Sequence, residues 1–368
     1  MPVKWKKQWI SDETYETAGV FDVDGDGLLD IVSGAFWYKG PDFRKKFFLG
    51  EPHAAPGGEY YDDFSTIAMD VNGDGRLDFV TGGWWGKSLR WRENPADPAG
   101  HWPEHFIAET GSIETARGWD LDGDGIAEIV PNTPGANSVS VFKLKIDKAG
   151  KGAGAFERHV VFEFPEEQTQ GHGLGCGDIA GNGRMDIALC KGWLESPADP
   201  FKGKWKWHPL PDYGWWGSSV PMLVVDVNGD GANDLIVGNG HGYGLIWLEH
   251  KGRRGGRKWI THKIDPDNAQ YHDMMWLDVD GDGKPELLTG KRHRAHCGND
   301  AGEWDDYGIY YFKWNGETFS KQVIAYGPIG ETKGCGIHFA AADFRKTGRP
   351  DLVAPGKDGL FVFFNEGC

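Results

Sequence analysis

The sequence predicts an all-β protein, a seven-bladed β-propeller with four-stranded blades that occupies residues 1–368 as a single domain. Three observations lead there: the chain has 368 residues, 56 of them are glycine, and an acidic loop motif occurs seven times. Such a length exceeds the usual size of a single core, so the chain holds either two domains or one repetitive architecture. Glycine at roughly twice its average frequency, together with 18 tryptophans, indicates short strands and many turns and is not typical of disorder.

The repeated motif is an acidic loop of the form D-x-[D/N]-x-D-G-x-x-[D/E] in most copies. Successive copies begin about 48 to 65 residues apart, which fits one four-stranded propeller blade per copy. The copies start at Asp22, Asp70, Asp120, Asp178, Asp226, Asp278 and Asp343.

Apolar runs on both sides of each loop predict the first two strands of a blade. A third strand is expected at residues 138–146, 244–250 and 308–315. A fourth strand has a histidine near an aliphatic residue, and we interpret these histidines as packing residues. They are His105, His159, His208 and His262.

The two ends of the chain are expected to share one blade. The last repeat has only three strands after its loop and ends in LFVFFN at residues 360–365, while KWKKQWI at residues 4–10 has the pattern of the missing fourth strand. Pairing them closes the ring, whereas the alternative of two separate sheets with a frayed N-terminus leaves unpaired edge strands.

The acidic loops predict calcium sites. Positions 1, 3, 5 and 9 offer oxygen ligands, which Ca²⁺ prefers, and glycines at positions 4 and 6 allow the tight turn. Five loops keep the whole ligand set, so about five structural Ca²⁺ ions are expected. The expected ligands are Asp22, Asp24, Asp26 and Asp30; Asp70, Asn72, Asp74 and Asp78; Asp120, Asp122, Asp124 and Glu128; Asp226, Asn228, Asp230 and Asp234; and Asp278, Asp280, Asp282 and Glu286.

Two copies of the loop depart from this set. The loop at Asp178 has Ala180 and Asn182, and the loop at Asp343 has Arg345, whose guanidinium can substitute for an ion. The alternative for all seven loops is that Asp and Gly shape the turns without metal.

A formal net charge of -16 makes nucleic acid an unexpected partner, because nothing offsets phosphate repulsion. The sequence has no run of apolar residues long enough for a membrane helix and no apolar signal core at its start. It fits a secreted or periplasmic protein whose leader has been removed, or otherwise a cytoplasmic one. Five cysteines without CxxC spacing indicate neither a zinc ribbon nor a disulfide framework.

These repeats resemble the FG-GAP or VCBS type of calcium-loop propeller repeat, found in the integrin head and in many bacterial proteins. The resemblance covers nearly the whole chain and implies the fold without implying one function. The Trp-rich units with W-x-x-H-x-I-like outer strands further resemble the propeller of aldos-2-ulose dehydratase. That similarity implies a metal-dependent enzyme that carries out β-elimination on sugars.

A second metal site is predicted at the propeller axis. The residue six places before each loop starts an innermost strand, so these residues lie at one level around the channel mouth. They are Glu16, Phe64, Glu114, His172, Val220, His272 and Ile337, with His338 one place later. Three imidazoles with Glu114 or Glu16 would hold Zn²⁺ or another transition metal, and the alternative is that a wet channel mouth simply carries polar residues.

The loops on the same face carry residues suited to a carbohydrate, since sugar C–H faces stack on indoles while hydroxyl groups take directional hydrogen bonds. The expected substrate-binding residues are Trp84, Trp85, Trp215, Trp216 and Arg292. We interpret Trp37 and Trp193 instead as packing residues.

The leading functional hypothesis is a metal-dependent sugar lyase or dehydratase. Glu114, His241 and His293 are the candidate bases, and Tyr243, Tyr307 and Lys191 are the candidate acids. One alternative is a non-catalytic propeller that binds a glycan or a protein. Another is a polysaccharide lyase with a basic groove for uronates, formed by Lys191, Lys291, Arg292 and Arg294.

Overall fold

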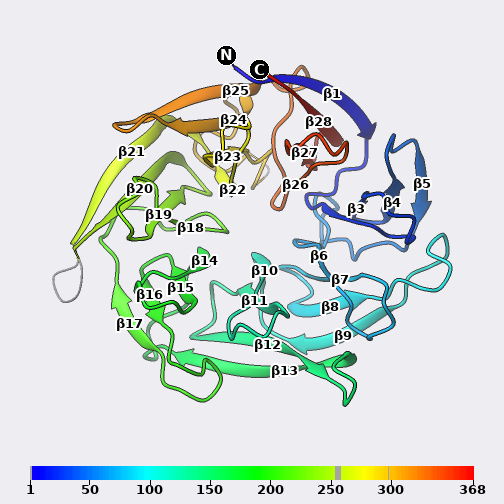
Figure 1. The fold of residues 1–368 in the computed structure, drawn as a ribbon, viewed down its shortest axis with the longest axis horizontal. Helices are drawn as coiled ribbons and strands as arrows, with labels where there is room; N and C mark the ends of the chain where they lie inside the picture. Colours follow the sequence, from blue (N-terminus) through cyan, green and yellow to red (C-terminus); the bar gives the residue numbers. More distant parts are fainter. Residues whose placement is uncertain (1, 253–257, 297) are drawn as a thin grey trace.

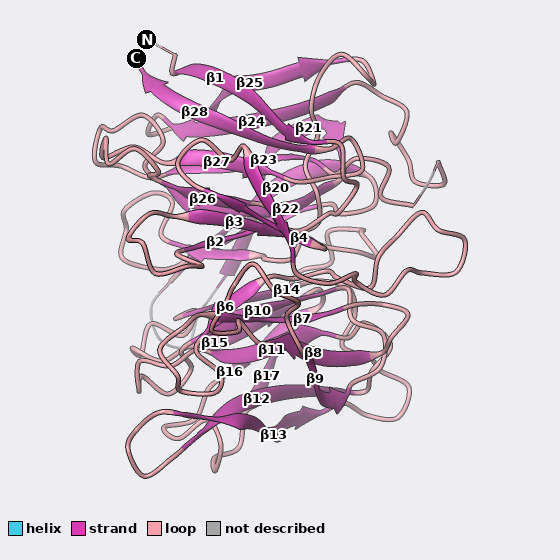
Figure 2. Cartoon of the chain, turned by 90° about the vertical axis from the view of Figure 1, so that its right-hand side faces the viewer, coloured by secondary structure: helices cyan, strands magenta, loops and turns pink. Residues whose placement is uncertain are grey.

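In the computed structural model, seven four-stranded antiparallel sheets surround a central axis (Figure 1). The structure describes residues 2–252, 258–296 and 298–368. All the regular secondary-structure elements in these residues are β-strands. Seen from the side, the sheets stack around the ring with their loops on two opposite faces (Figure 2). The predicted all-β seven-bladed propeller is therefore confirmed.

Each blade runs from an inner strand outward through three more strands, in chain order except for the last blade, whose outermost strand is β1. The inner strands are β2 (Gly19–Phe21), β6 (Ile67–Met69), β10 (Thr115–Trp119), β14 (Leu174–Gly177), β18 (Leu223–Val225), β22 (Tyr271–Leu277) and β26 (Ala340–Ala342). The second strands are β3 (Asp30–Ser33), β7 (Asp78–Gly82), β11 (Glu128–Asn132), β15 (Asp186–Leu189), β19 (Asp234–Gly238), β23 (Glu286–Lys291) and β27 (Asp351–Ala354).

The third and fourth strands form the outer half of each blade. The third strands are β4 (Phe36–Lys39), β8 (Ser88–Arg92), β12 (Ser138–Ile146), β16 (Gly192–Glu195), β20 (Tyr243–Lys251), β24 (Tyr307–Trp314) and β28 (Leu360–Gly367). The fourth strands are β5 (Lys45–Phe48), β9 (Glu104–Glu109), β13 (Gly152–Glu163), β17 (Lys206–Pro209), β21 (Lys258–Ala269), β25 (Phe319–Gly327) and β1 (Lys4–Ser11).

The N-terminal strand closes the ring as predicted. β1 pairs antiparallel with β28, so the first and last strands complete one blade and the two termini lie side by side (Figure 1). This pairing covers the edge of β28 that an open ring would leave exposed.

The hydrophobic cores lie between neighbouring blades. One buried cluster joins each adjacent pair of sheets, as where Trp37 of the first blade packs with Phe79 and Trp102 of the second. Near the axis the blades approach so closely that a Cβ on Gly175 would lie 2.1 Å from the carbonyl oxygen of Met222. Glycine is therefore required in β14 where it meets the next blade.

Three of the four outer histidines pack on tryptophans, in keeping with their interpretation as packing residues. Trp91, Trp193 and Trp247 each stack on the histidine opposite them, with ring centroids 4.2 to 4.4 Å apart. In each pair the histidine also contacts a glutamate, such as Glu195 beside His208 at 2.7 Å. His159 packs instead on Phe201.

Candidate functional site

Four predicted residues meet at the propeller axis. Glu114 directly precedes β10, His172 lies just before β14, His272 is in β22, and His241 comes from the loop between β19 and β20. One possible ligand atom from each of the four lies within 4.8 Å of the others, and all four side chains are buried. We call this group the axial cluster.

Short contacts hold the axial cluster together. Glu114 Oε1 lies 2.9 Å from His272 Nε2 and 3.2 Å from His172 Nε2. The Nε2 atoms of His172 and His241 are only 2.9 Å apart. All three imidazoles therefore direct Nε2 toward the same small volume.

The hydrogen bonds of two outer nitrogens determine which tautomers are present. Nδ1 of His172 lies 2.7 Å from the Ser218 carbonyl oxygen, which can only accept, so this nitrogen donates. Nδ1 of His241 donates in the same way to the carboxylate of Asp300, at 2.9 Å. In the neutral rings both Nε2 atoms then carry lone pairs and face each other across 2.9 Å, an arrangement that needs a cation between or beside them.

Burial disfavours a proton on two of the three imidazoles. Burial, together with the neighbouring His172, lowers the pKa of His241 to about 4 despite its bond to Asp300. Burial also lowers the pKa of His272 well below its ordinary value, although Glu114 opposes this. Three imidazoles and one carboxylate form a donor set that suits Zn²⁺ or another divalent transition metal.

A cavity of about 900 Å³ opens above the axial cluster. Its walls are largely aromatic and its floor includes Glu114, His172 and His241. Trp216 is 64% exposed and stacks on His241 with ring centroids 4.4 Å apart. The wall residues include Tyr60, Phe64, Trp84, Trp85, Lys191, Trp216, Arg292 and His296.

The structure places Glu16 and His338 outside the axial cluster. The Glu16 carboxylate pairs with Arg292, whose Nε lies 2.9 Å from Oε1, and with Lys357 at 3.4 Å. Nδ1 of His338 accepts a hydrogen bond from the Thr66 amide at 3.3 Å. His338 stands one residue later in the repeat than the other histidines, and alternation along a strand turns its side chain another way.

His272 departs from its expected wet position at the channel mouth, because its side chain is fully buried. Arg292 lines the cavity, yet it is also buried and bridges Glu16 and Glu114, 3.3 Å from the latter. Its guanidinium therefore holds the two carboxylates in place. From the sequence, Arg292 was expected to bind substrate, and this structural role was not predicted.

Other predicted residues lie away from the cavity wall. The rings of His293 and Tyr307 stack on each other at 4.5 Å, and both are buried. The Tyr243 hydroxyl donates to Asp305. Trp215 packs against Tyr213 and does not line the cavity. Of the candidate acids, Lys191 alone is both on the wall and exposed.

The sequence interpretation missed the pair of His296 and Asp300. Nδ1 of His296 lies 2.9 Å from Asp300 Oδ1, and the other oxygen of the same carboxylate accepts from His241. The ring of His296 also stacks on His241 at 4.3 Å and lines the cavity. Both residues lie in the polar loop after β23, whose composition indicated a functional role. The spacing of residues within that loop did not distinguish these two from their neighbours.

Hydrogen bonds from backbone amides to aspartate side chains hold the turns of the acidic loops. Glycines at positions 4 and 6 have positive φ, for example 73° and 84° at Gly25 and Gly27. The first aspartate accepts amide hydrogens within its own loop, as Asp22 does from Gly25 at 2.8 Å. Asp178 makes equivalent bonds to Asn182 and Gly183 in a loop that lacks the ligand set.

The carboxylate at position 9 also has a structural role. Asp30, Asp78 and Asp234, which were expected as calcium ligands, each accept two backbone amides. Asp186, in the loop that lacks the ligand set, also accepts two backbone amides, from Ala180 and Ser196. The position-9 aspartates thus join the turn to the third strand by hydrogen bonds, whether or not the rest of the ligand set is present. At Asp343 the Arg345 guanidinium contacts Asp351, as the sequence suggested.

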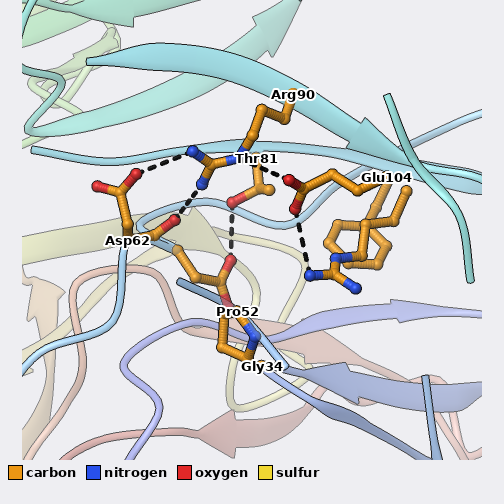
Figure 3. A pocket seen from close by; sticks show the side chains of 9 residues that line it. Gly34, Pro52, Asp62, Thr81, Arg90 and Glu104 are labelled. Carbon is orange, nitrogen blue, oxygen red and sulfur yellow. Dashed lines mark hydrogen bonds and ion pairs between the residues drawn. The ribbon is translucent and has the colours of Figure 1, made fainter. Parts of the chain in front are cut away.

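A second polar cluster lies between the first two blades (Figure 3). Arg90 pairs with Asp62 at 2.9 Å and approaches Glu104 at 3.6 Å, around a cavity of about 10 Å³. This volume corresponds to about one water molecule, so the cluster has no room for a substrate. We interpret it as an ionic contact that joins the segment before β6 to β8 and β9 of the second blade.

Within the described residues no helix is long and apolar enough to cross a membrane. The described cysteines, Cys176, Cys190, Cys335 and Cys368, are free thiols. Cys297 lies outside the described residues.

Comparisons with known proteins agree with this architecture. Residues 70–131 and 226–289 match the FG-GAP-like repeat. The integrin alpha pat-2 of Caenorhabditis elegans is 25% identical over 220 residues, a match that covers 48% of this chain and 17% of the worm protein.

Two solved structures share the fold at 11% identity. BBS1N, in its complex with ARL6DN, has a TM-score of 0.57. The match covers 99% of this chain and 98% of BBS1N. The extracellular domain of a one-component system from B. thetaiotaomicron has a TM-score of 0.53, with coverage of 98% of this chain and 39% of that one. The chain is therefore a seven-bladed β-propeller that carries FG-GAP-like repeats.

Proposed function

We propose that this chain is a metal-dependent carbon–oxygen lyase that acts on a carbohydrate next to a carbonyl group. The observation that carries the proposal is the axial cluster, in which the lone pairs of His172 and His241 face each other on the floor of an aromatic cavity. His172, His241, His272 and Glu114 would hold the ion. A bound divalent ion would supply Lewis acidity to a carbonyl or hydroxyl oxygen of the sugar.

The residues around the cavity can supply the proton transfers of a β-elimination. His296, oriented by Asp300, lies on the wall and can remove the proton next to the carbonyl. As the carbon–carbon double bond forms and the carbon–oxygen bond breaks, the exposed Lys191 can protonate the leaving oxygen. Trp84, Trp85 and Trp216 offer faces on which a sugar ring would stack.

Metal content tests the first half of the proposal. The wild-type chain should retain a transition metal after calcium is removed with a calcium-selective chelator, and His172→Ala should lose it. His208→Ala is the matched control, because His208 packs on Trp193 in an outer strand. Equal transition-metal content in His172→Ala and the control would eliminate the axial metal site.

Activity tests the second half. The metal-loaded protein is incubated with keto-sugars, glycosides and uronic polysaccharides, and the absorbance of an unsaturated product is followed. We expect a product from keto-sugars and a loss of at least about 100-fold in rate in His296→Ala, the range that a general base contributes. A metal-loaded protein that yields no unsaturated product from any of the three classes would contradict the lyase proposal.

A non-catalytic binding propeller is the second candidate, and the similarity to an integrin α chain favours it. In that case glycan or protein binding would survive His296→Ala. The third hypothesis, a lyase for uronate polysaccharides, has less support because its basic groove is mostly committed elsewhere. Lys291 is buried and donates to the Asp305 carbonyl, and Arg294 pairs with Glu59 at 3.3 Å.

A further inference from the structure

One position on the third strand of each blade varies together with position 3 of the acidic loop. The residue at position 10 of each acidic loop pairs with a residue of the third strand, and the position in question is the next residue along that strand. In the first blade Ile31 pairs with Tyr38, so the position is that of Lys39. In blade order the third-strand residues are Lys39, Glu93, Lys143, Glu195, Glu249, Lys313 and Phe364. The residues at loop position 3 are, in the same order, Asp24, Asn72, Asp122, Ala180, Asn228, Asp280 and Arg345. Lysine thus occurs in all three blades whose loop has aspartate at position 3, and in none of the others.

The three lysines reach into their loops. The Lys143 ammonium lies 2.7, 2.6 and 2.8 Å from carboxylate oxygens of Asp122, Asp124 and Glu128. Lys39 contacts Asp24 and Asp26 in the same way. Lys313 contacts Asp280 and Asp282, and lies 3.5 Å from Glu286. Each ammonium therefore occupies the place among the loop carboxylates where an ion would be expected.

The loops with asparagine at position 3 are built differently. The Asn228 amide donates to Glu249 at 3.1 Å, and the Asn72 amide faces Glu93 at 3.4 Å. These glutamates are held from the other side by outer-strand histidines, as Glu249 is by His262 at 2.8 Å. In the two asparagine loops the third strand therefore adds a negative charge, where the aspartate loops receive a positive one.

The lysines keep their charge at neutral pH. A lysine ammonium is ordinarily charged at this pH, and that of Lys143 lies among the carboxylates of Asp122, Asp124 and Glu128. A Ca²⁺ ion could enter such a loop only by displacing an ammonium that already contacts two or three carboxylates, and like charges at this distance repel.

We propose that Lys39, Lys143 and Lys313 take the place of Ca²⁺ in the loops at Asp22, Asp120 and Asp278. These three loops thus disagree with the calcium binding that the ligand residues predict for all five intact ones. The loops at Asp70 and Asp226 are the intact loops that receive no such lysine.

The test is the number of Ca²⁺ ions bound per chain, measured by equilibrium dialysis of the full chain with Ca²⁺ as the probe. Lys143→Met should bind one more ion than the wild type, because the substitution leaves the three carboxylates without a cation. Lys145→Met is the matched control, since Lys145 is exposed on the same strand two residues further on. Its stoichiometry should equal that of the wild type.

Thermal melting gives an independent readout. Lys143→Met should melt lower than the control in chelator, and added Ca²⁺ should raise its melting temperature more than that of the wild type. Lys39→Met provides the same comparison if Lys143→Met does not fold. A wild-type chain that binds five Ca²⁺ ions, or a folded lysine variant with the stoichiometry of Lys145→Met, would overturn the proposal.

Discussion

Asp358 illustrates how one partly buried carboxylate links loops of the last two blades. Its carboxylate contacts the fully buried ammonium of Lys333, accepts the Gly334 amide at 2.9 Å and lies 3.2 Å from Nδ1 of His293. Burial by itself would raise the pKa of Asp358, but Lys333 and His293 lower it to about 2. The ionised carboxylate is therefore favoured in the folded chain over the unfolded chain.

Asp358→Asn should accordingly lower the free energy of unfolding by at least about 2 kcal/mol at pH 7. Because the folded pKa lies below the unfolded one, this stability is present above about pH 4 and is lost as the pH falls toward 2. The difference between wild type and variant should shrink to about half at pH 3. Urea unfolding of both proteins at pH 7 and pH 3 measures it, and a difference that does not depend on pH would contradict this account.

At the axial cluster, three of the four residues followed from a single sequence register. Glu114, His172 and His272 all stand six places before a loop, and the ring of inner strands brings that position to one level. His241 comes from a loop, and so do Asp300 and Arg292, which orient the cluster. A register carried by strands cannot place loop residues, because their approach depends on packing across blades.

Among the elements, the acidic loop is the most regular, and its position-9 carboxylate is the part shared by loops with and without the ligand set. Asp186 lies in the loop that has Ala180 at position 3, and its two oxygens accept the amides of Ala180 and Ser196 at 2.7 and 2.8 Å. Removing a buried acceptor of this kind leaves two donors unsatisfied.

Asp186→Ala should therefore lower the free energy of unfolding by about 2 to 4 kcal/mol. Asn182→Ala in the same loop should cost less than about 1 kcal/mol, since Asn182 is exposed and accepts only the Arg184 amide. Chemical denaturation of the two variants in excess chelator makes the comparison. Similar losses in both variants would indicate that position 9 has no special structural role.

Strand order and blade number were accessible from the sequence because each blade repeats the same loop and the same apolar runs. Ring closure was accessible for the same reason, since KWKKQWI at residues 4–10 supplies the one strand that the last repeat lacks. The lysine contacts of the loops were not accessible from the sequence, because the third-strand lysines lie 17 to 35 residues after the loop begins, at spacings that differ between blades. Only the strand pairing shows that Lys39, Lys143 and Lys313 face equivalent carboxylates.

For the whole molecule, the pairing of β1 with β28 decides whether the ring is closed. The pairing runs from Lys4 opposite Gly367 to Ser11 opposite Leu360, and β28 contributes the buried residues Val362 and Phe363 to the cores on its two sides. An unpaired β28 would present its backbone donors and acceptors to other chains.

Deleting residues 1–10 should therefore produce a protein that melts at a lower temperature and aggregates at concentrations where the full chain stays monodisperse, because the deletion opens an edge and does more than trim a tail. Size-exclusion chromatography with light scattering, together with thermal melts, measures both effects. A synthetic peptide of residues 1–11 should reduce the aggregation by pairing with β28 in place of the missing strand, whereas a scrambled peptide should not. A truncated chain that melts like the full one, with no response to the peptide, would mean that the stability of the ring does not depend on this strand.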